Sequence, residues 1–309
     1  MLTRWPHPLA PLPLRSTHQV SAQWLKDNGR SPRLHVLDAT WFLPTEQRDA
    51  AKEHAEKRID GAKFFDIDAI ADKASSLPHM LPSEAHFSEA CDALGVKQGD
   101  CVVVYDAKGL FSAARAWWMF RVFGHSNVAV LDGGLPAWEA AGGKLTSGAE
   151  EAPNTTQSDG TALVAALDAS LVADVPRVLA ALAGGDETVV IDARGAGRFR
   201  GEAAEPRPGV RSGHMPGSRS VPMTAVLNAD GTLKDEAGIR AAFEAGGAVS
   251  ALPGSGGAGE TVASCGTGVT ACVLALALFR LGRRDVAVYD GSWSEWGARE
   301  DLPCAAGDA

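Results

Sequence analysis

Residues 261–270 read TVASCGTGVT, an apolar run that is followed at once by a cysteine and two glycines. The stretch that continues from it, 269–280 (VTACVLALALFR), is mostly apolar and favours a helix. The pattern predicts a buried strand, a tight turn that carries Cys265, and a buried helix. In an open α/β sheet, ligands bind at the edge where the strands end, so we expect Cys265 to lie at a binding site.

The turn has the composition of an anion cradle. The first N–H groups of the predicted helix have no partner within the helix and point towards the turn. Gly266 and Gly268 allow the backbone to curl further N–H groups inward. Such a positive environment favours the thiolate of a cysteine and stabilises a persulfide or a developing anion. We therefore predict that Cys265 is a nucleophile.

A structural role is the alternative for a free cysteine, because most free cysteines are buried in cores. We expect that role for Cys272, which lies within the predicted apolar helix, and for Cys91, Cys101 and Cys304. A phosphatase loop is a second alternative, but it requires an arginine six residues after the cysteine to bind phosphate. Ala271 occupies that position, so the sequence argues against phosphatase chemistry.

The chain contains a diverged internal repeat that predicts its architecture. The first copy comprises residues 36–39 (VLDA), 59–62 (IDGA), 101–106 (CVVVYD) and 128–134 (VAVLDGG). The second comprises residues 189–193 (VVIDA), 214–218 (HMPGS), 261–265 (TVASC) and 286–291 (VAVYDG). Both alternate short apolar runs with longer helical patterns, which is typical of parallel strands joined by crossover helices. The runs are continuously apolar, so we expect strands that are buried on both faces.

We therefore expect an α/β protein with two tandem domains, each a mostly parallel sheet flanked by helices. The first domain is expected at residues 18–145 and the second at residues 162–300. Residues 146–161 are expected to form a linker, since their central part is rich in Glu, Pro, Thr, Ser and Asn and lacks apolar periodicity. Residues 1–17 contain four prolines, which predicts an extended arm.

Composition limits the partners. The net charge is −9 and the chain has no block of Lys and Arg, so we expect neither nucleic acid nor a membrane surface as a partner. No apolar run reaches the ~18 residues that a membrane span requires. The five cysteines show neither a C-x-x-C motif nor a metal-ligand spacing. This predicts free thiols, no metal site and a reducing, cytoplasmic environment.

The chain resembles the tandem-domain rhodanese sulfurtransferases, and within them the branch that uses 3-mercaptopyruvate. Six motifs carry the resemblance: residues 64–68 (FFDID), 79–82 (HMLP), 117–125 (WWMFRVFGH), 197–201 (GRFRG), 265–270 (CGTGVT) and 289–293 (YDGSW). It implies two rhodanese-like domains, an active site between them, and a catalytic cysteine in the second domain alone. The position in the first copy that corresponds to Cys265 is Asp106, which cannot carry a persulfide.

The resemblance also implies a sulfur donor. Relatives that use thiosulfate carry basic side chains in the loop after the cysteine, which suit a doubly negative donor. Gly266, Thr267 and Gly268 carry no charge, which matches the form that uses 3-mercaptopyruvate, although that form usually has Ser where this chain has Thr267. A thiosulfate:cyanide sulfurtransferase and a catalytically silent sulfur-carrier module are the alternatives.

Arginines are expected to bind the donor. Arg198 and Arg207 correspond to the two substrate-binding arginines of the family, and a guanidinium forms directional hydrogen bonds with a carboxylate and an adjacent ketone. Arg194 is expected to have a structural role, and Arg200 and Arg211 lie close by in the sequence. The loop residues expected to line the same site are Gly266, Gly268, Val269 and Thr270.

The resemblance further implies a relay and ping-pong sulfur transfer. Thr267, His79 and Asp68 correspond to a proposed hydroxyl relay that polarises the ketone or protonates the departing enolate. The Cys265 thiolate would attack the donor sulfur, pyruvate would leave, and the persulfide would pass its sulfur to cyanide, a small thiol or thioredoxin. No cofactor is implied, and we expect a monomer.

Overall fold

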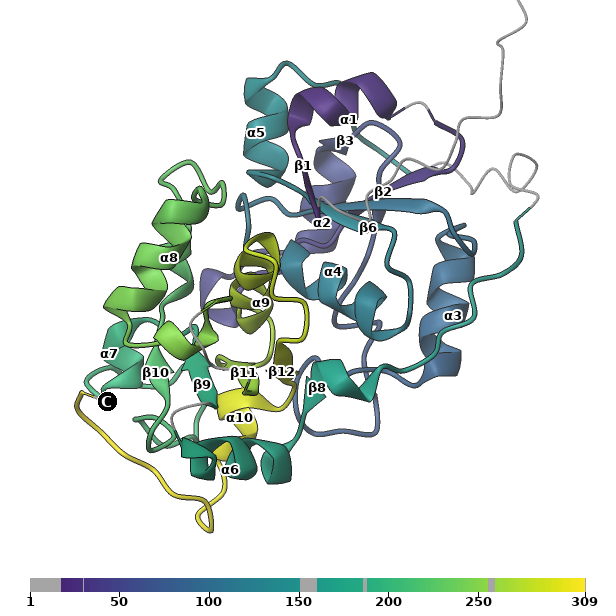
Figure 1. The fold of residues 1–309 in the computed structure, drawn as a ribbon. Helices are drawn as coiled ribbons and strands as arrows, with labels where there is room; N and C mark the ends of the chain where they lie inside the picture. Colours follow the sequence, from purple (N-terminus) through teal and green to yellow (C-terminus); the bar gives the residue numbers. More distant parts are fainter. Residues whose placement is uncertain (1–17, 30, 151–159, 186–187, 255–258, 309) are drawn as a thin grey trace, which may run out of the picture.

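The computed structural model describes residues 18–29, 31–150, 160–185, 188–254 and 259–308, and Figure 1 shows how their helices and strands are arranged. The arm expected at residues 1–17 and the central part of the expected linker lie outside the described residues. The described residues form two parallel sheets with helices packed against them, which confirms the predicted α/β class.

The first sheet, within the described residues, has five parallel strands in the order β1-β6-β5-β2-β4. These strands are β1 (Gln19–Val20), β2 (Leu34–Asp38), β4 (Lys63–Phe64), β5 (Cys101–Tyr105) and β6 (Val128–Leu131). The helices of this half are α1 (Ala22–Asn28), α2 (Ala50–Glu56), α3 (Glu84–Ala93), α4 (Ala113–Val122) and α5 (Gly134–Ala140). A short antiparallel pair is formed by β3 (Arg58–Ile59) and β7 (Leu145–Thr146).

The second sheet also has five parallel strands over the residues described, in the order β10-β9-β11-β12-β8. These strands are β8 (Val172–Ala173), β9 (Val189–Asp192), β10 (Arg219–Ser220), β11 (Thr261–Ser264) and β12 (Ala287–Tyr289). The helices of this half are α6 (Val175–Ala183), α7 (Ala196–Phe199), α8 (Glu236–Ala245), α9 (Ala271–Arg280) and α10 (Ser292–Trp296).

The two sheets share one topology, which confirms the internal repeat. The strand order β8-β12-β11-β9-β10 of the second sheet matches β1-β6-β5-β2-β4 of the first, strand for strand. β5 and β11 occupy the centre of each sheet, and Asp106 and Cys265 follow them directly. Every residue of β5, β6, β9, β11 and β12 is buried, as expected for strands covered on both faces.

Helices α4 and α9 pack against each other between the two sheets (Figure 1). One apolar cluster contains Trp117 and Trp118 of α4 together with Val273 and Leu276 of α9. All residues of α9 except Arg280 are buried, which confirms the buried helix predicted from the apolar stretch. The two domains therefore share a continuous core, and their relative placement is fixed by apolar packing.

The segment that joins the domains contacts the first domain on both sides of the undescribed residues. The guanidinium of Arg58 donates to the carbonyl oxygen of Gly148 at 2.8 Å. The N–H of Asp168 donates to the carbonyl oxygen of Val122 at 2.7 Å. Residues 162–168, which the sequence analysis places in the second domain, thus lie against the first, and the second sheet begins with β8.

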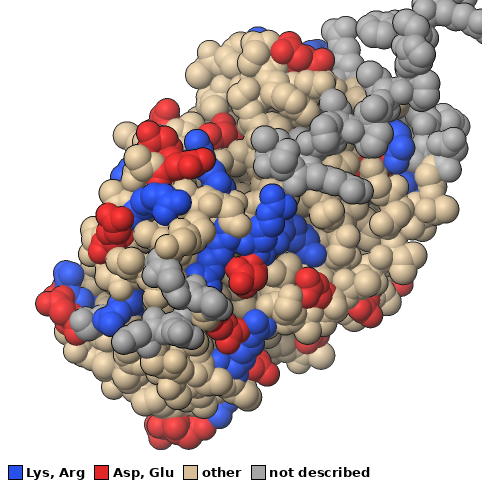
Figure 2. All heavy atoms as spheres, in the orientation of Figure 1, with Lys and Arg blue, Asp and Glu red and all other residues tan. Residues whose placement is uncertain are grey.

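Charged side chains are unevenly distributed over the surface. Figure 2 shows a group of Lys and Arg side chains near the middle of the displayed face, over the region that α4 and α9 occupy in Figure 1. A surface hollow of about 540 Å³ is lined by residues of both domains, among them Arg121, Arg283 and Arg284. The acidic chain thus has a basic area at the domain junction. No helix in the described ranges is long and apolar enough to cross a membrane.

Candidate active site

The loop between β11 and α9 holds Cys265 at the carboxyl edge of the second sheet. Cys265 is only 1% exposed, so its thiol lies beneath the surface. Gly268 has a φ of +73°, the left-handed conformation that the expected cradle requires. Gly266 has no positive φ, and a Cβ atom there would lie 3.1 Å from Nη2 of Arg198. The expectation of a curled backbone therefore holds for Gly268, whereas glycine at position 266 allows the close approach of Arg198.

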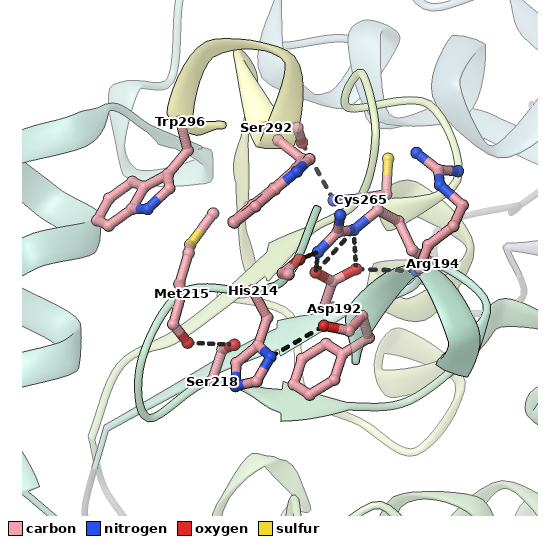
Figure 3. Close-up of polar contacts among 12 residues, drawn as sticks. Asp192, Arg194, His214, Met215, Ser218, Cys265, Ser292 and Trp296 are labelled. Atoms are coloured by element: carbon pink, nitrogen blue, oxygen red, sulfur yellow. Dashed lines mark hydrogen bonds and ion pairs between the residues drawn. The ribbon is translucent and has the colours of Figure 1, made fainter. Parts of the chain in front are cut away.

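The first residues of α10 hold this loop in place. Ser292 accepts a hydrogen bond at its Oγ from the backbone N–H of Cys265 at 3.2 Å, a contact drawn in Figure 3. The N–H of Trp293 donates to the carbonyl oxygen of Cys265 at 3.0 Å, and the N–H of Ser294 donates to that of Gly266 at 2.9 Å. Ser292 is a site residue that was not predicted, although the motif at residues 289–293 contains it.

A single carboxylate orients two arginines beside the loop. Glu205 accepts hydrogen bonds from Nε and Nη2 of Arg198, the former at 3.2 Å. It also accepts one from Nη1 of Arg194 at 2.8 Å. Arg194 is buried and pairs with Asp192 at 2.7 Å (Figure 3), which confirms its expected structural role. Arg198 thus presents a preset guanidinium to the loop.

Arg207 lies within electrostatic reach of the same group. Its guanidinium is half-buried and makes no hydrogen bond or ion pair with the residues that the structure describes. Burial lowers the pKa of Arg207, as does the positive charge of Arg198, whereas Asp68, Cys265 and Glu205 oppose that shift. Arg207 therefore has a positive charge that is available to an anionic ligand.

The neighbouring arginines have other partners. Arg200 pairs with Glu202 at the surface, with 2.8 Å between Nη2 and Oε2. Arg211 donates to backbone carbonyl groups within residues 296–302. Arg200 and Arg211 thus have described partners for their guanidinium groups, which distinguishes them from Arg207.

The first domain contributes His79 and Asp68 to the junction. Nδ1 of His79 lies 2.8 Å from Oδ1 of Asp68. Trp41 donates from Nε1 to Oδ2 of Asp68 at 3.0 Å, and its ring contacts the imidazole edge-on, with 4.7 Å between centroids. The contact with His79 lowers the pKa of the Asp68 carboxyl below its ordinary value, although partial burial opposes this. Two of the three predicted relay residues are therefore adjacent.

The third relay residue is not joined to them in this state. Thr267 is buried, and within the described part of the chain no hydrogen bond links Thr267 to Nε2 of His79. The side chain of Val269 packs into the core. Thr270 is the N-cap residue of α9. The relay through Thr267 stays a prediction, as do the substrate contacts expected of Val269 and Thr270.

The corresponding loop of the first domain is closed by its own carboxylate. Asp106 is buried and accepts hydrogen bonds from four backbone N–H groups, those of Lys108, Phe111, Ser112 and Ala113, at 2.7 to 3.0 Å. Burial raises the pKa of Asp106, and the four donors oppose that shift. An internal carboxylate thus fills the loop of the first domain, whereas the corresponding position in the second domain carries the thiol of Cys265.

The remaining cysteines have the surroundings of structural residues. All five cysteines are free. Burial raises the pKa values of Cys91 and Cys101 to about 12. Burial also raises the pKa of Cys272, whose Sγ donates to the carbonyl oxygen of Gly268 at 3.2 Å. Among the described residues, no group of three or more His, Cys, Asp or Glu side chains is placed to hold a metal ion.

Known proteins resemble the chain over nearly its whole length. A family model described as the rhodanese-like domain matches residues 21–141 and 175–299. Thiosulfate/3-mercaptopyruvate sulfurtransferase 1, mitochondrial, of Arabidopsis thaliana is 44% identical over 298 residues, which are 92% of this chain and 77% of that protein. The 3-mercaptopyruvate sulfurtransferase of Escherichia coli (strain K12) is 42% identical over 292 residues, 94% of this chain and 98% of that protein. The crystal structure of the 3-mercaptopyruvate sulfotransferase SseA from Escherichia coli matches with a TM-score of 0.77 and 39% identity, over 90% of this chain and 99% of that one.

Proposed function

The chain belongs to the rhodanese family and is a sulfurtransferase, and from this premise we propose that it takes sulfur from 3-mercaptopyruvate through a persulfide on Cys265. The observation that carries the proposal is the placement of Cys265 in a turn that faces Arg198 and that lies within electrostatic reach of Arg207. A buried thiol flanked by two guanidinium groups suits a donor that carries its own negative charge.

Arg198 and Arg207 make different contributions to the binding of the donor. Arg198, held by Glu205, keeps Nη1 without a hydrogen bond to any described residue, so this nitrogen is free to donate to the ligand. Arg207 supplies the second positive charge. Together they bind the carboxylate and the ketone of mercaptopyruvate and direct its sulfur towards Cys265.

The first half-reaction transfers one sulfur atom. The thiolate of Cys265 attacks the donor sulfur, a new S–S bond forms, and the C–S bond of the donor breaks. The bonding electron pair stays on carbon as the enolate of pyruvate, which a proton then converts to pyruvate. The pair His79 and Asp68 supplies that proton or orients the group that does, and the hydroxyl of Thr267 polarises the ketone.

The second half-reaction restores the enzyme. A nucleophilic acceptor, such as cyanide or a thiolate, attacks the outer sulfur of the persulfide, the S–S bond breaks, and Cys265 leaves as a thiolate. With a dithiol protein such as thioredoxin, the second thiol displaces hydrosulfide and a disulfide forms. Neither half-reaction consumes a cofactor.

Thiosulfate is the competing donor, and the name of the Arabidopsis thaliana relative includes it. The loop after Cys265 contains only Gly266, Thr267 and Gly268 before the core residue Val269, so no basic side chain of the loop can bind a dianion. This composition favours the monoanionic donor. Comparing kcat/KM for the two donors tests the choice, and a preference for thiosulfate of about tenfold or more would overturn it.

Sulfur uptake itself is tested by mass spectrometry of the intact protein after exposure to the donor. We expect a gain of about 32 Da that is absent in Cys265→Ser and retained in Cys304→Ser, a matched control at a partly exposed cysteine. Steady turnover with pyruvate release excludes the silent carrier module. Wild-type protein that gains no mass would contradict the proposal.

We also propose a cytoplasmic location and a monomeric active form. The five free thiols suit a reducing compartment such as the cytoplasm. Arg115 contacts both the segment of His79 and the loop of Cys265, and Arg198 lies beside that loop, which supports our expectation that a monomer is active. Size-exclusion chromatography coupled to light scattering, with activity measured across the same fractions, checks this expectation.

A further inference from the structure

Arg115 is a fully buried arginine in the domain that lacks the catalytic cysteine. It lies in the first turn of α4 and is 0% exposed. Burying a guanidinium is unfavourable unless its donors are satisfied, so the partners of this side chain indicate its role. Those partners come from the site described above and from both domains.

The guanidinium connects three segments. Its Nη1 lies 2.7 Å from Oδ1 of Asp290, the residue that follows β12. The same nitrogen donates to the carbonyl oxygen of Gly268, in the loop of Cys265, at 3.3 Å. Its Nη2 donates to the carbonyl oxygen of His79. One side chain of the first domain thus fixes the cysteine loop relative to the imidazole.

Asp290 reaches back across the junction. Its Oδ2 accepts a hydrogen bond from the N–H of Leu81 at 2.8 Å, two residues after His79. A Cβ atom on Gly268 would lie 2.7 Å from the carbonyl oxygen of Asp290 and 3.0 Å from Nη1 of Arg115. The left-handed residue of the cysteine loop is therefore packed directly against this ion pair.

The internal repeat supplies a comparison within the same chain. Asp132 follows β6 as Asp290 follows β12, and its Oδ1 accepts a hydrogen bond across the junction from the N–H of Leu233 at 2.9 Å. No described contact joins Asp132 to the cysteine loop. Asp132 is thus a matched control that has the interdomain contact without the link to the site.

We propose that Arg115 and Asp290 are positioning residues for sulfur transfer. The first domain acts on the reaction through them, because they set the position of the Gly268 carbonyl and hence the geometry of the loop around Cys265. They also set the distance between that loop and the segment of His79. The proposal rests on the proposed function, since it needs Cys265 to be the sulfur acceptor, but it assigns no contact with substrate to either residue.

The test measures kcat, KM and the single-turnover rate of sulfur loading on Cys265 for Arg115→Lys, Asp290→Asn and Asp132→Asn. We expect Arg115→Lys and Asp290→Asn to lower kcat and the loading rate about 10- to 100-fold, because a shift of the loop by about 1 Å misaligns the attack. KM for the donor changes less than about threefold, since Arg198 and Arg207 are untouched. Asp132→Asn keeps kcat within about twofold.

The thermal unfolding of each variant is measured as well. All rates are measured at a temperature well below the lowest unfolding midpoint among the variants. Asp290→Asn is nearly isosteric and retains an acceptor for Leu81, so it decides the question if Arg115→Lys does not fold. A folded variant of either residue with wild-type kcat, or an equal loss in Asp132→Asn, would overturn the inference. Wild-type protein that takes up no sulfur on Cys265 would instead overturn the proposed function, so the two failures are distinguishable.

Discussion

Nδ1 of His79 lies 2.8 Å from Oδ1 of Asp68, and both residues belong to the domain that does not contain Cys265. His79 is buried and has a φ of +61°, a left-handed conformation that is uncommon for residues other than glycine. A left-handed backbone at this position is held by its surroundings, which include Trp41 against the ring. The imidazole is therefore oriented in advance at the domain junction.

Replacing that imidazole is expected to slow turnover. His79→Asn suits the left-handed backbone, so it removes the ring without adding strain there. We expect kcat with 3-mercaptopyruvate to fall about 100-fold or more if His79 moves a proton, with little change in KM. Steady-state kinetics checks this, with His86→Asn on α3 as a control that keeps wild-type rates. Unchanged turnover in His79→Asn would remove the residue from the mechanism.

The hydroxyl of Thr267 is tested by two substitutions that differ in one group. Thr267→Ser retains the hydroxyl and Thr267→Val retains the branched shape. We expect Thr267→Ser to stay within about threefold of wild type and Thr267→Val to lose about tenfold or more in kcat. Equal rates for the two variants would show that the buried hydroxyl takes no part.

We expect donor binding to depend on Arg198, which lies beside the loop, and on Arg207, whose charge interacts with Cys265. Lysine keeps the charge but lacks the planar pair of donors, so Arg198→Lys and Arg207→Lys are each expected to raise KM for 3-mercaptopyruvate about tenfold or more. Arg200→Lys is the matched control, because Arg200 pairs with Glu202 at the surface. A comparable rise in KM for this control would contradict the assignment.

The pH dependence of thiol labelling distinguishes the structural cysteines. Burial raises the pKa values of Cys91 and Cys101 to about 12, so these groups remain protonated thiols below that pH, and only the thiolate reacts with iodoacetamide. We expect no labelling of either residue in the folded protein up to about pH 9, and full labelling in urea. Peptide mapping by mass spectrometry gives the result, and labelling of either cysteine in the folded protein would contradict it.

The carboxylate of Asp106 is expected to stabilise the first domain. Asp106→Ala leaves four backbone N–H groups, two of them buried, without their acceptor, so we expect the free energy of unfolding to fall by about 2–4 kcal/mol. Asp235→Ala removes an exposed N-cap of α8 and is expected to lower it by only about 1 kcal/mol. Urea denaturation of the two variants measures both free energies of unfolding. An equal decrease in both would show that the Asp106 carboxylate contributes no more to stability than an exposed N-cap.

The internal repeat and the position of Cys265 at the edge of the sheet could be predicted because they depend on local patterns. Continuously apolar short runs that alternate with longer helical patterns predicted the two parallel sheets. The position of Cys265 between such a run and a Gly-rich turn predicted that it follows a strand at the carboxyl edge of the sheet, as the structure shows. One detail differs from the prediction, since only Gly268 is left-handed, whereas Gly266 allows the close approach of Arg198.

Other features depended on contacts between distant residues. Ser292 was within a recognised motif, but only the packing of α10 showed that its hydroxyl accepts a hydrogen bond from Cys265. Arg115 lies 153 positions from Gly268 along the chain, and nothing in its neighbourhood on α4 indicates the contact. A buried arginine has the same local sequence whether it pairs within its own domain or across a junction.

The sequence by itself determined the two α/β halves, the position of Cys265 at the end of a strand and the charge-free loop that follows it. These follow from residue spacing and backbone preference, which act over a few residues. Only the tertiary structure decided which of the clustered arginines faces Cys265, and that His79 and Arg115 reach the junction from the other domain. The physical reason is that burial and pairing of charges are set by the packing of α4 against α9, which brings together residues that are far apart in the chain.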